Sequence, residues 1–315
     1  MIDDGLEVLF ICSVARTGKC SPAVREQARC LKEAGLQVSF FGVEKGGFMG
    51  YLTSLFRLRR FLHKQSFQVI HAHYGLSGVL ASLAGARPLV VSLMGSDVLG
   101  HALMRGVMSL FVNHIWRTVV VKSPEMAEVV GVNKVHVIPN GVDLSRFREL
   151  ARHTARQNLG VSAWRVILWP ASPARKVKDY ALAERTVKNL NRSDCQLLIA
   201  DGVPAEEMPL YYNAADVVLI TSRHEGSPNV VKEALACNVP VVSTPVGDVE
   251  YWLNGLSGCS VCPHEPESLA SGLERALQGS GRCKGRARVQ EVNGTEFSEK
   301  IITLYRQQLA RGTGK

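Results

Sequence analysis

The chain has 315 residues, of which 46% are hydrophobic, 21% charged and 7% aromatic. This composition excludes disordered, collagen-like and coiled-coil proteins, and at roughly 100–200 residues per domain the length predicts two domains. The formal net charge of +9 favours an anionic partner, which could be nucleic acid, a phosphorylated ligand or a membrane surface.

Membrane-spanning, exported and metal-binding classes find little support. Arg105, His114 and Arg117 interrupt the most apolar stretch, so we expect a core helix and a strand there, not a transmembrane helix. Acidic residues near the start, where a signal peptide is basic, predict a cytoplasmic chain whose eight cysteines are reduced thiols. Cys259 and Cys262 form a CxxC pair without a second pair at matching spacing, so we expect no metal.

Short apolar runs alternate with amphipathic segments along almost the whole chain. Continuous apolar runs indicate strands buried on both faces, as in parallel sheets covered by helices. The expected strands cover residues 7–12, 37–41, 68–72, 89–93, 118–122, 135–138, 166–169, 196–200, 216–221, 239–243 and 259–262. The expected helices cover residues 23–34, 51–64, 181–190, 228–237, 268–277 and 296–310.

This α/β pattern occurs twice and predicts two doubly wound, Rossmann-like parallel-sheet domains facing a cleft. We expect an N-terminal domain at residues 1–143 and a second domain at residues 164–295. A polar linker with a helix-like stretch would cover residues 144–163. The final helix, residues 296–312, is a candidate to pack back on the first domain.

The segment from Glu225 to Glu233 reads as a strand end, a loop and a helix. Ser227 suits the N-cap and Pro228 the first helical position, and free N–H groups at such a helix start can bind an anion. Two carboxylates placed on either side could grip two ends of one ligand, with a diphosphate between them. The alternative is that both are solvated surface acids.

A basic loop follows the first strand of the second half. Arg175, Lys176 and Lys178 are the residue types that bind phosphate, and ligands of open parallel sheets lie at the carboxyl ends of strands. A solvated basic loop is the alternative.

Loops of the first half also follow strand ends. They contain Gly18, His73, Gly95 and Asp97, and histidines with an aspartate could form a catalytic or metal set. The absence of GxGxxG and GxxxxGK[ST] patterns removes the main support for dinucleotide-binding and NTPase functions. We expect no metal here either, because no DxD pair is present and the basic loop could neutralise a diphosphate.

Five motifs in order along nearly the whole chain resemble the retaining glycosyltransferases of family 4, which have the GT-B fold. The motifs are Ile138-Pro-Asn-Gly-Val-Asp143, Asn213-Ala-Ala-Asp-Val217, the Glu225-x7-Glu233 pair, Pro240-Val-Val242 and Gly247. The form of residues 232–249 is similar to the TuaC-like branch, which is associated with teichuronic acid and other surface polysaccharides. Met94 and Ser172 stand where many members have histidine and arginine.

The resemblance implies a role for each matching residue. Glu225 would contact the donor sugar, Glu233 would hold the nucleotide ribose, and Lys178 would bind the donor phosphates, with Arg175 as a substitute for the missing arginine. The other donor-binding candidates are Gly226, Ser227, Pro228, Asn229 and Val230. The acceptor-side candidates are His73, Asp97, Gly95 and Gly18.

The implied activity is metal-independent, hexosyltransferase-type transfer from a UDP- or GDP-sugar to a lipid-linked or glycan acceptor, with retention of configuration. A nucleotide-sugar epimerase or phosphorylase and a catalytically silent nucleotide-binding subunit are the alternatives. The basic amphipathic segment 56–64, with Arg57, Arg59, Arg60 and Lys64, resembles a membrane-facing helix and predicts peripheral contact with the inner face of an anionic membrane. A solvated helix with a buried apolar stripe is the alternative. Nucleic acid is not expected, because no recognition motif accompanies the charge.

Overall fold

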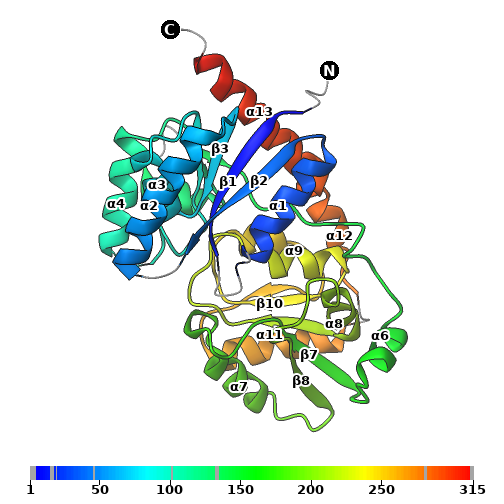
Figure 1. Ribbon diagram of the computed structural model, residues 1–315. Coiled ribbons are helices and arrows are strands. Elements are labelled where there is room, and N and C mark those ends of the chain that lie inside the picture. The colour runs from blue at the N-terminus through cyan, green and yellow to red at the C-terminus, as the bar shows by residue number, and fades with distance from the viewer. Residues whose placement is uncertain are drawn as a thin grey trace. The chain divides into compact units, whose positions relative to one another are not determined.

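The computed structural model describes residues 5–14, 18, 20–44, 47–100, 102–131, 135–279 and 282–312. The chain divides into two compact units, which we describe separately (Figure 1). The first unit consists of Met1–Gly141 together with Gly294–Lys315, and the second of Val142–Asn293. The chain therefore passes into the second unit within the motif at residues 138–143 and later returns to the first.

The described part of the first unit contains a six-stranded parallel sheet in the order β2-β1-β3-β4-β5-β6. Its strands are β1 (Glu7–Val14), β2 (Gln37–Glu44), β3 (Val69–His73), β4 (Leu89–Ser92), β5 (Val119–Val121) and β6 (Val135–Val137). Its helices are α1 (Pro22–Glu33), α2 (Gly47–Lys64), α3 (Gly75–Leu83), α4 (Ala102–His114), α5 (Pro124–Val130) and α13 (Gly294–Gly312). Every expected strand of this half is confirmed within a few residues.

The last helix, α13, completes the first unit. It lies beside α1 (Figure 1) and buries Phe297, Ile301, Leu304 and Tyr305 in the same apolar cluster as β1 and α1. The Tyr305 hydroxyl lies 2.6 Å from Nδ1 of buried His71. This contact ties the end of the chain to the third strand of the sheet.

Within the described range of the second unit, five parallel strands form a sheet in the order β11-β10-β9-β7-β8. They are β7 (Arg165–Trp169), β8 (Cys195–Ile199), β9 (Val217–Ile220), β10 (Val241–Ser243) and β11 (Ser260–Val261). The helices are α6 (Arg152–Leu159), α7 (Tyr180–Asn189), α8 (Met208–Ala214), α9 (Asn229–Ala236), α10 (Val249–Leu253), α11 (Pro266–Gln278) and α12 (Gly285–Arg288). The prediction of two Rossmann-like parallel-sheet units is confirmed.

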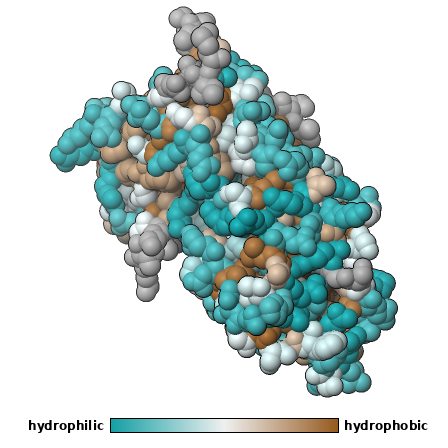
Figure 2. All heavy atoms as spheres, turned by 90° about the vertical axis from the view of Figure 1, so that its right-hand side faces the viewer, coloured by the Kyte–Doolittle hydropathy of each residue, from teal (hydrophilic) through white to brown (hydrophobic). Residues whose placement is uncertain are grey.

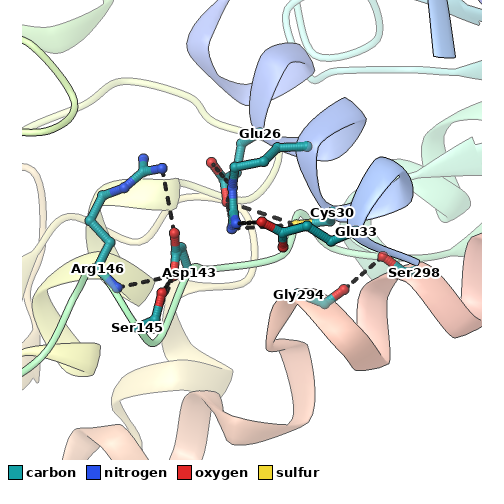
Figure 3. A network of polar contacts seen from close by, with 9 residues as sticks. Glu26, Cys30, Glu33, Asp143, Ser145, Arg146, Gly294 and Ser298 are labelled. Carbon is teal, nitrogen blue, oxygen red and sulfur yellow. Dashed lines mark hydrogen bonds and ion pairs between the residues drawn. The ribbon is translucent and has the colours of Figure 1, made fainter. Parts of the chain in front are cut away.

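Residues 144–163, which we expected to be a linker, belong to the second unit. Asp143 Oδ1 accepts hydrogen bonds from the backbone of Ser145 and Arg146 at 2.9 and 3.0 Å (Figure 3), so a turn precedes α6 where the expected helix would have begun. Arg152 and Arg156 then reach Asp216 at 3.1 and 2.6 Å. These ion pairs attach the segment to the residue that precedes β9.

Arginines of the basic stretch 282–288 bind backbone carbonyl oxygens within the second unit. Arg286 donates to the carbonyl oxygens of Leu144, Phe147 and Ala236 at 2.6, 2.6 and 2.9 Å, and Arg282 donates to that of Asn213 at 3.0 Å. Charge-assisted bonds of this kind are stronger than neutral ones. Part of the basic excess therefore holds the second unit together.

The prediction that all eight cysteines are reduced thiols is wrong for one pair. Cys12 and Cys20 are joined in a disulfide, with their Cα atoms 6.3 Å apart. An antiparallel bridge between Val14 and Cys20 brings the ends of this short loop together.

The face drawn in Figure 2 is mostly hydrophilic, and its hydrophobic side chains gather in small groups. Across the residues described above, no helix combines the length and the apolar character that crossing a membrane requires.

Candidate functional site

Lys178 and Glu225 form the centre of the candidate site in the second unit. Lys178 ends the short 3-10 helix η2 (Lys176–Lys178) after β7, and Glu225 lies in the loop after β9. The Lys178 ammonium forms an ion pair with Glu225 Oε1, and the Ser222 hydroxyl donates to the same oxygen at 2.9 Å. The two side chains are 11% and 18% exposed, so the pair is shielded from water but still reachable.

Neighbouring strands hold the two loops together. β7 and β9 pair directly, and Trp169 at the end of β7 donates through Nε1 to the Thr221 hydroxyl at 3.0 Å. Thr221 in turn donates to the carbonyl oxygen of Lys178 at 2.7 Å. This chain of bonds fixes the backbone of the lysine against the start of the glutamate loop.

The start of α9 differs from the expectation. Pro228, not Ser227, is the N-cap, with φ −69° and ψ 117°, and it makes no side-chain cap. Proline has no N–H group, so Pro228 cannot donate to a ligand. The first-turn N–H groups that remain, at positions such as Val230, point back toward residues 225–228, because the N–H groups of a helix face its amino end.

The Ser227 hydroxyl serves a buried polar network in place of the helix cap. Lys232 Nζ donates to Ser227 Oγ at 2.8 Å, and this hydroxyl donates to Asp248 Oδ2 at 2.6 Å. Lys232 is fully buried, and burial lowers the pKa of its ammonium to about 8, with Asp248 and Glu233 opposing the shift. The network ties the glutamate loop to the helix behind it and to the loop after β10.

Gly247 permits a close approach of two loops. Its φ is +54°, and a Cβ atom there would lie 2.4 Å from the Gly226 carbonyl oxygen and 2.9 Å from that of Glu225. Any larger residue would combine backbone strain with a steric clash. The glycine of the last motif therefore supports the loop that carries Glu225.

Glu233 lies one helical position beyond Lys232 and is half-buried. The Tyr212 hydroxyl donates to Glu233 Oε2 at 2.7 Å, and burial together with this carboxylate raises the pKa of Tyr212 well above its ordinary value. Tyr212 therefore stays protonated and keeps the carboxylate in one orientation. Glu233 is thus a part-exposed helix residue whose carboxylate is held by a hydrogen bond.

Arg175 and Lys176 are exposed, unlike Lys178. Arg175 is the N-cap of η2, where its backbone N–H donates to the Ser172 carbonyl oxygen at 3.0 Å. The described residues show no contact between its guanidinium and Glu225. The structure thus brings together Lys178 and Glu225 but leaves Arg175 extended into solvent.

In the first unit, His73 ends β3 and is 1% exposed. Its ring stacks on His71 with 4.2 Å between centroids and lies 4.3 Å from Phe10, while neither ring nitrogen has a hydrogen-bond partner among the described residues. Burial, with the charge of Lys122 adding to it, lowers the pKa of His73 well below its ordinary value. The imidazole is therefore neutral, with one donor and one acceptor nitrogen, both of them buried.

Asp97 is fully buried and bonds to backbone groups of its own unit. Its carboxylate accepts from the N–H groups of Gly75, Met94 and Gly95 at 2.8, 3.0 and 2.9 Å. This pattern gives Asp97 the task of fixing the loops after β3 and β4. Gly18 is exposed with φ +72°, and residues 15–17 and 19 of the same loop lie outside the described residues.

Local sequence signals did not reveal Lys232, Asp248 and Tyr212 as parts of this site. Their hydrogen-bond partners lie 5 to 21 residues away in the sequence. A short motif therefore does not show these contacts. A lysine on an otherwise apolar helix face was the one available signal, because a buried lysine needs a partner.

Two family models cover most of the chain. The model for glycosyltransferase family 4 matches residues 5–146, and the model for glycosyl transferases group 1 matches residues 148–279. The chain belongs to glycosyltransferase family 4. It is a glycosyltransferase of the GT-B fold, and each matched range falls mainly on one of its two units, while α13 lies outside both ranges.

Curated relatives of this family-4 chain include two bacterial groups of proteins. D-inositol 3-phosphate glycosyltransferase 1 of Catenulispora acidiphila is 25% identical in an alignment 310 residues long, which covers 79% of this chain and 74% of that protein. A Bacillus subtilis protein named as the teichuronic acid biosynthesis glycosyltransferase TuaC is 28% identical over 236 residues, or 66% of this chain and 60% of TuaC.

Solved structures share the fold at low sequence identity. Sucrose-phosphate synthase from Thermosynechococcus elongatus superimposes with a TM-score of 0.83 at 18% identity, covering 96% of this chain and 99% of that one. HepE of Anabaena, solved in complex with UDP and glucose, gives a TM-score of 0.69 at 18% identity and covers 98% and 100%.

Proposed function

We propose that this family-4 glycosyltransferase moves a hexosyl group from a nucleoside-diphosphate sugar to an acceptor hydroxyl, with retention of the anomeric configuration. The observation that carries the proposal is the shielded Lys178–Glu225 pair, held at the carboxyl ends of two adjacent strands. This edge of a parallel sheet is where such folds bind their ligands.

The residues around the pair suit a nucleotide-sugar donor. The Lys178 ammonium has three donor hydrogens, so it can orient Glu225 and still bind a phosphate oxygen, while the amino end of α9 favours negative charge. Glu233, oriented by Tyr212, suits the ribose hydroxyls. UDP and glucose in the HepE complex support a UDP-sugar as the first donor to test, with a GDP-sugar as the second.

In the proposed reaction, the bond between the anomeric carbon and the diphosphate oxygen breaks, and a bond to the acceptor oxygen forms on the same face of the sugar. The acceptor proton passes to the leaving diphosphate. Lys178 and the start of α9 stabilise the charge that gathers on the diphosphate. His73, whose ring is neutral, is the candidate residue for contact with the acceptor. Asp97 positions the loops beside His73.

We also propose that the positive groups of the protein perform the charge neutralisation without a metal ion, with exposed Arg175 as a second cation on the donor. Excess EDTA should then leave kcat unchanged. Loss of turnover on EDTA treatment and its recovery with a divalent ion would contradict this part.

A role in surface or exopolysaccharide synthesis is the biological context we propose, supported by the similarity to TuaC. The deciding experiment is a thermal-shift comparison of UDP, GDP and ADP, followed by turnover of the donor sugars of the responding nucleotide and NMR of the anomeric product. Donor conversion without a glycoside would instead indicate an epimerase or phosphorylase. Nucleotide binding without transfer to any acceptor tested would indicate a silent subunit.

A further inference from the structure

A pocket in the first unit lies far along the sheet from the residues discussed above. It has a volume of about 400 Å³, and its lining includes Leu89, Ile115 and Trp116. Leu89 is the first residue of β4, and Trp116 shortly precedes β5. The pocket therefore opens at the amino ends of the strands, whereas His73 and Asp97 lie at or beyond their carboxyl ends.

Three arginines from distant parts of the sequence line this pocket. Arg87 precedes β4, Arg117 precedes β5, and Arg311 lies near the end of α13. All three are exposed, and no hydrogen bond or ion pair of their guanidinium groups occurs among the described residues. Arg286, by contrast, is anchored by three carbonyl oxygens of the protein.

The charge of the pocket is not balanced by its own lining. None of its described lining residues is acidic. The charge of Arg311 also acts on His136 in β6, the strand next to β5. Burial lowers the pKa of His136, and the positive charge of Arg311 lowers it further. Like charges around one cavity repel each other, so an anion in the cavity would lower the electrostatic energy.

Hydrogen bonds hold part of the pocket lining in place, and the lining is partly apolar. The Trp116 indole donates to the Ser82 hydroxyl at 2.9 Å, and the buried Thr118 hydroxyl donates to Gln308 at 2.6 Å. Leu89 and half-exposed Ile115 supply aliphatic surface beside the arginines. Side chains already held by hydrogen bonds lose less conformational entropy when a ligand binds.

We propose that Arg87, Arg117 and Arg311 form a binding site for a phosphate-bearing ligand, separate from the donor site. Planar guanidinium groups match the geometry of phosphate oxygens and bind them bidentately. The aliphatic lining fits a ligand in which the phosphate carries an apolar group. The phosphate comes either from a phospholipid headgroup or from a free phosphate compound.

The test is isothermal titration of the full chain with inorganic pyrophosphate, in the wild type and in the triple variant Arg87→Gln, Arg117→Gln, Arg311→Gln. Arg105→Gln is the matched control, because Arg105 is also exposed on the first unit but lies outside the pocket lining. The same titrations in the Lys178→Gln background separate pyrophosphate held at the donor site. Vesicles of phosphatidylcholine with and without phosphatidylglycerol distinguish a lipid headgroup from a free phosphate.

In the Lys178→Gln background we expect one pyrophosphate-binding event that survives Arg105→Gln and disappears in the triple variant, and vesicle binding that the triple variant weakens. Each single neutralisation should weaken vesicle or pyrophosphate binding by about fivefold, the equivalent of ~1 kcal/mol per arginine. Equal binding of pyrophosphate and of both vesicle types by the triple variant and the control would overturn the proposal, as would the absence of any binding outside the donor site. Unchanged melting temperatures of the variants would show that the exposed substitutions leave the fold intact.

Discussion

Lys178 and Glu225 are 47 residues apart in the sequence and form an ion pair between adjacent strand ends. The structure also shows why they meet: Thr221 and Trp169 fasten the backbone of one loop to the other. Because the two side chains are mostly buried but still partly exposed, the pair can keep its geometry and can also exchange one of its contacts for a contact with a ligand. These properties suit a site that must grip a charged donor and release it.

Removing either partner should reduce turnover without unfolding the protein. We expect Lys178→Ala and Glu225→Gln to lower kcat/KM by about 10²- to 10³-fold, the typical cost of losing one preorganised group that stabilises transition-state charge. Lys176→Ala is the control, because Lys176 is exposed in the same short helix and should stay near wild-type turnover. Steady-state kinetics and melting temperatures of all three variants check this. Near-normal turnover in both the Lys178 and the Glu225 variant would contradict the assignment of these residues to the active site.

Buried Lys232 should give stability a distinct dependence on pH. Its folded-state pKa is about 8, below the ordinary 10.5, so the unfolded chain binds more protons than the folded chain between these values. The free energy of unfolding contributed by this residue should therefore rise from pH 8 to 10.5, by about 3 kcal/mol in total, and be lost as the pH falls through 8.

Denaturant unfolding of the wild type and of Lys232→Met across this range isolates the effect, because every other titrating group is common to both. The difference between the two curves should grow with pH. Parallel curves would show that folding does not lower the pKa of Lys232. The conservative Lys232→Arg variant keeps the charge and should flatten the rise, since arginine remains protonated throughout.

Gly247→Ala should displace the loop that carries Glu225, an effect that backbone strain alone does not explain. Gly255 has a similar positive φ of +73° but nothing within 4 Å of an added Cβ atom, so Gly255→Ala should cost only about 1 kcal/mol of stability. Gly247→Ala should cost more and should also raise the KM for the donor, because its Cβ atom would push against the Gly226 carbonyl. Equal KM values in the two variants would contradict the role assigned to Gly247.

The basic face of α2 should bind anionic membranes through charge more than through apolar contact. Leu58 is fully buried, and Leu55, Phe61 and Leu62 pack against the core, so most of the apolar stripe is used inside the unit, while Phe56 is 65% exposed. Replacing Arg59, Arg60 and Lys64 with Gln should lower sedimentation with phosphatidylglycerol vesicles at low salt, by ~1 kcal/mol per residue. Lys188→Gln on α7 is the control. Sedimentation insensitive to both salt and the triple substitution would leave α2 without this role.

The strands of both units could be predicted from the sequence because continuous apolar runs indicate burial on two faces. Hydrophobicity is a property of each side chain and can be read from the sequence directly. The residues that shape the site could not be predicted in the same way. Ser227 looked like a helix cap because its neighbours have cap chemistry, but Asp248 and Lys232 compete for its hydroxyl from other elements. The helix-like stretch expected within residues 144–163 begins only at Arg152, after a turn whose backbone N–H groups at Ser145 and Arg146 donate to Asp143.

The split of the first unit across the two ends of the chain has a consequence for biosynthesis. A ribosome that has released residues up to 293 has made every strand and helix of the second unit, whereas the first unit still lacks Tyr305 beside His71 and the apolar face of α13. The N-terminal half of the protein must therefore wait, with part of its hydrophobic surface uncovered, until the last helix emerges. Deletion of α13 would thus damage the unit whose strands were synthesised first.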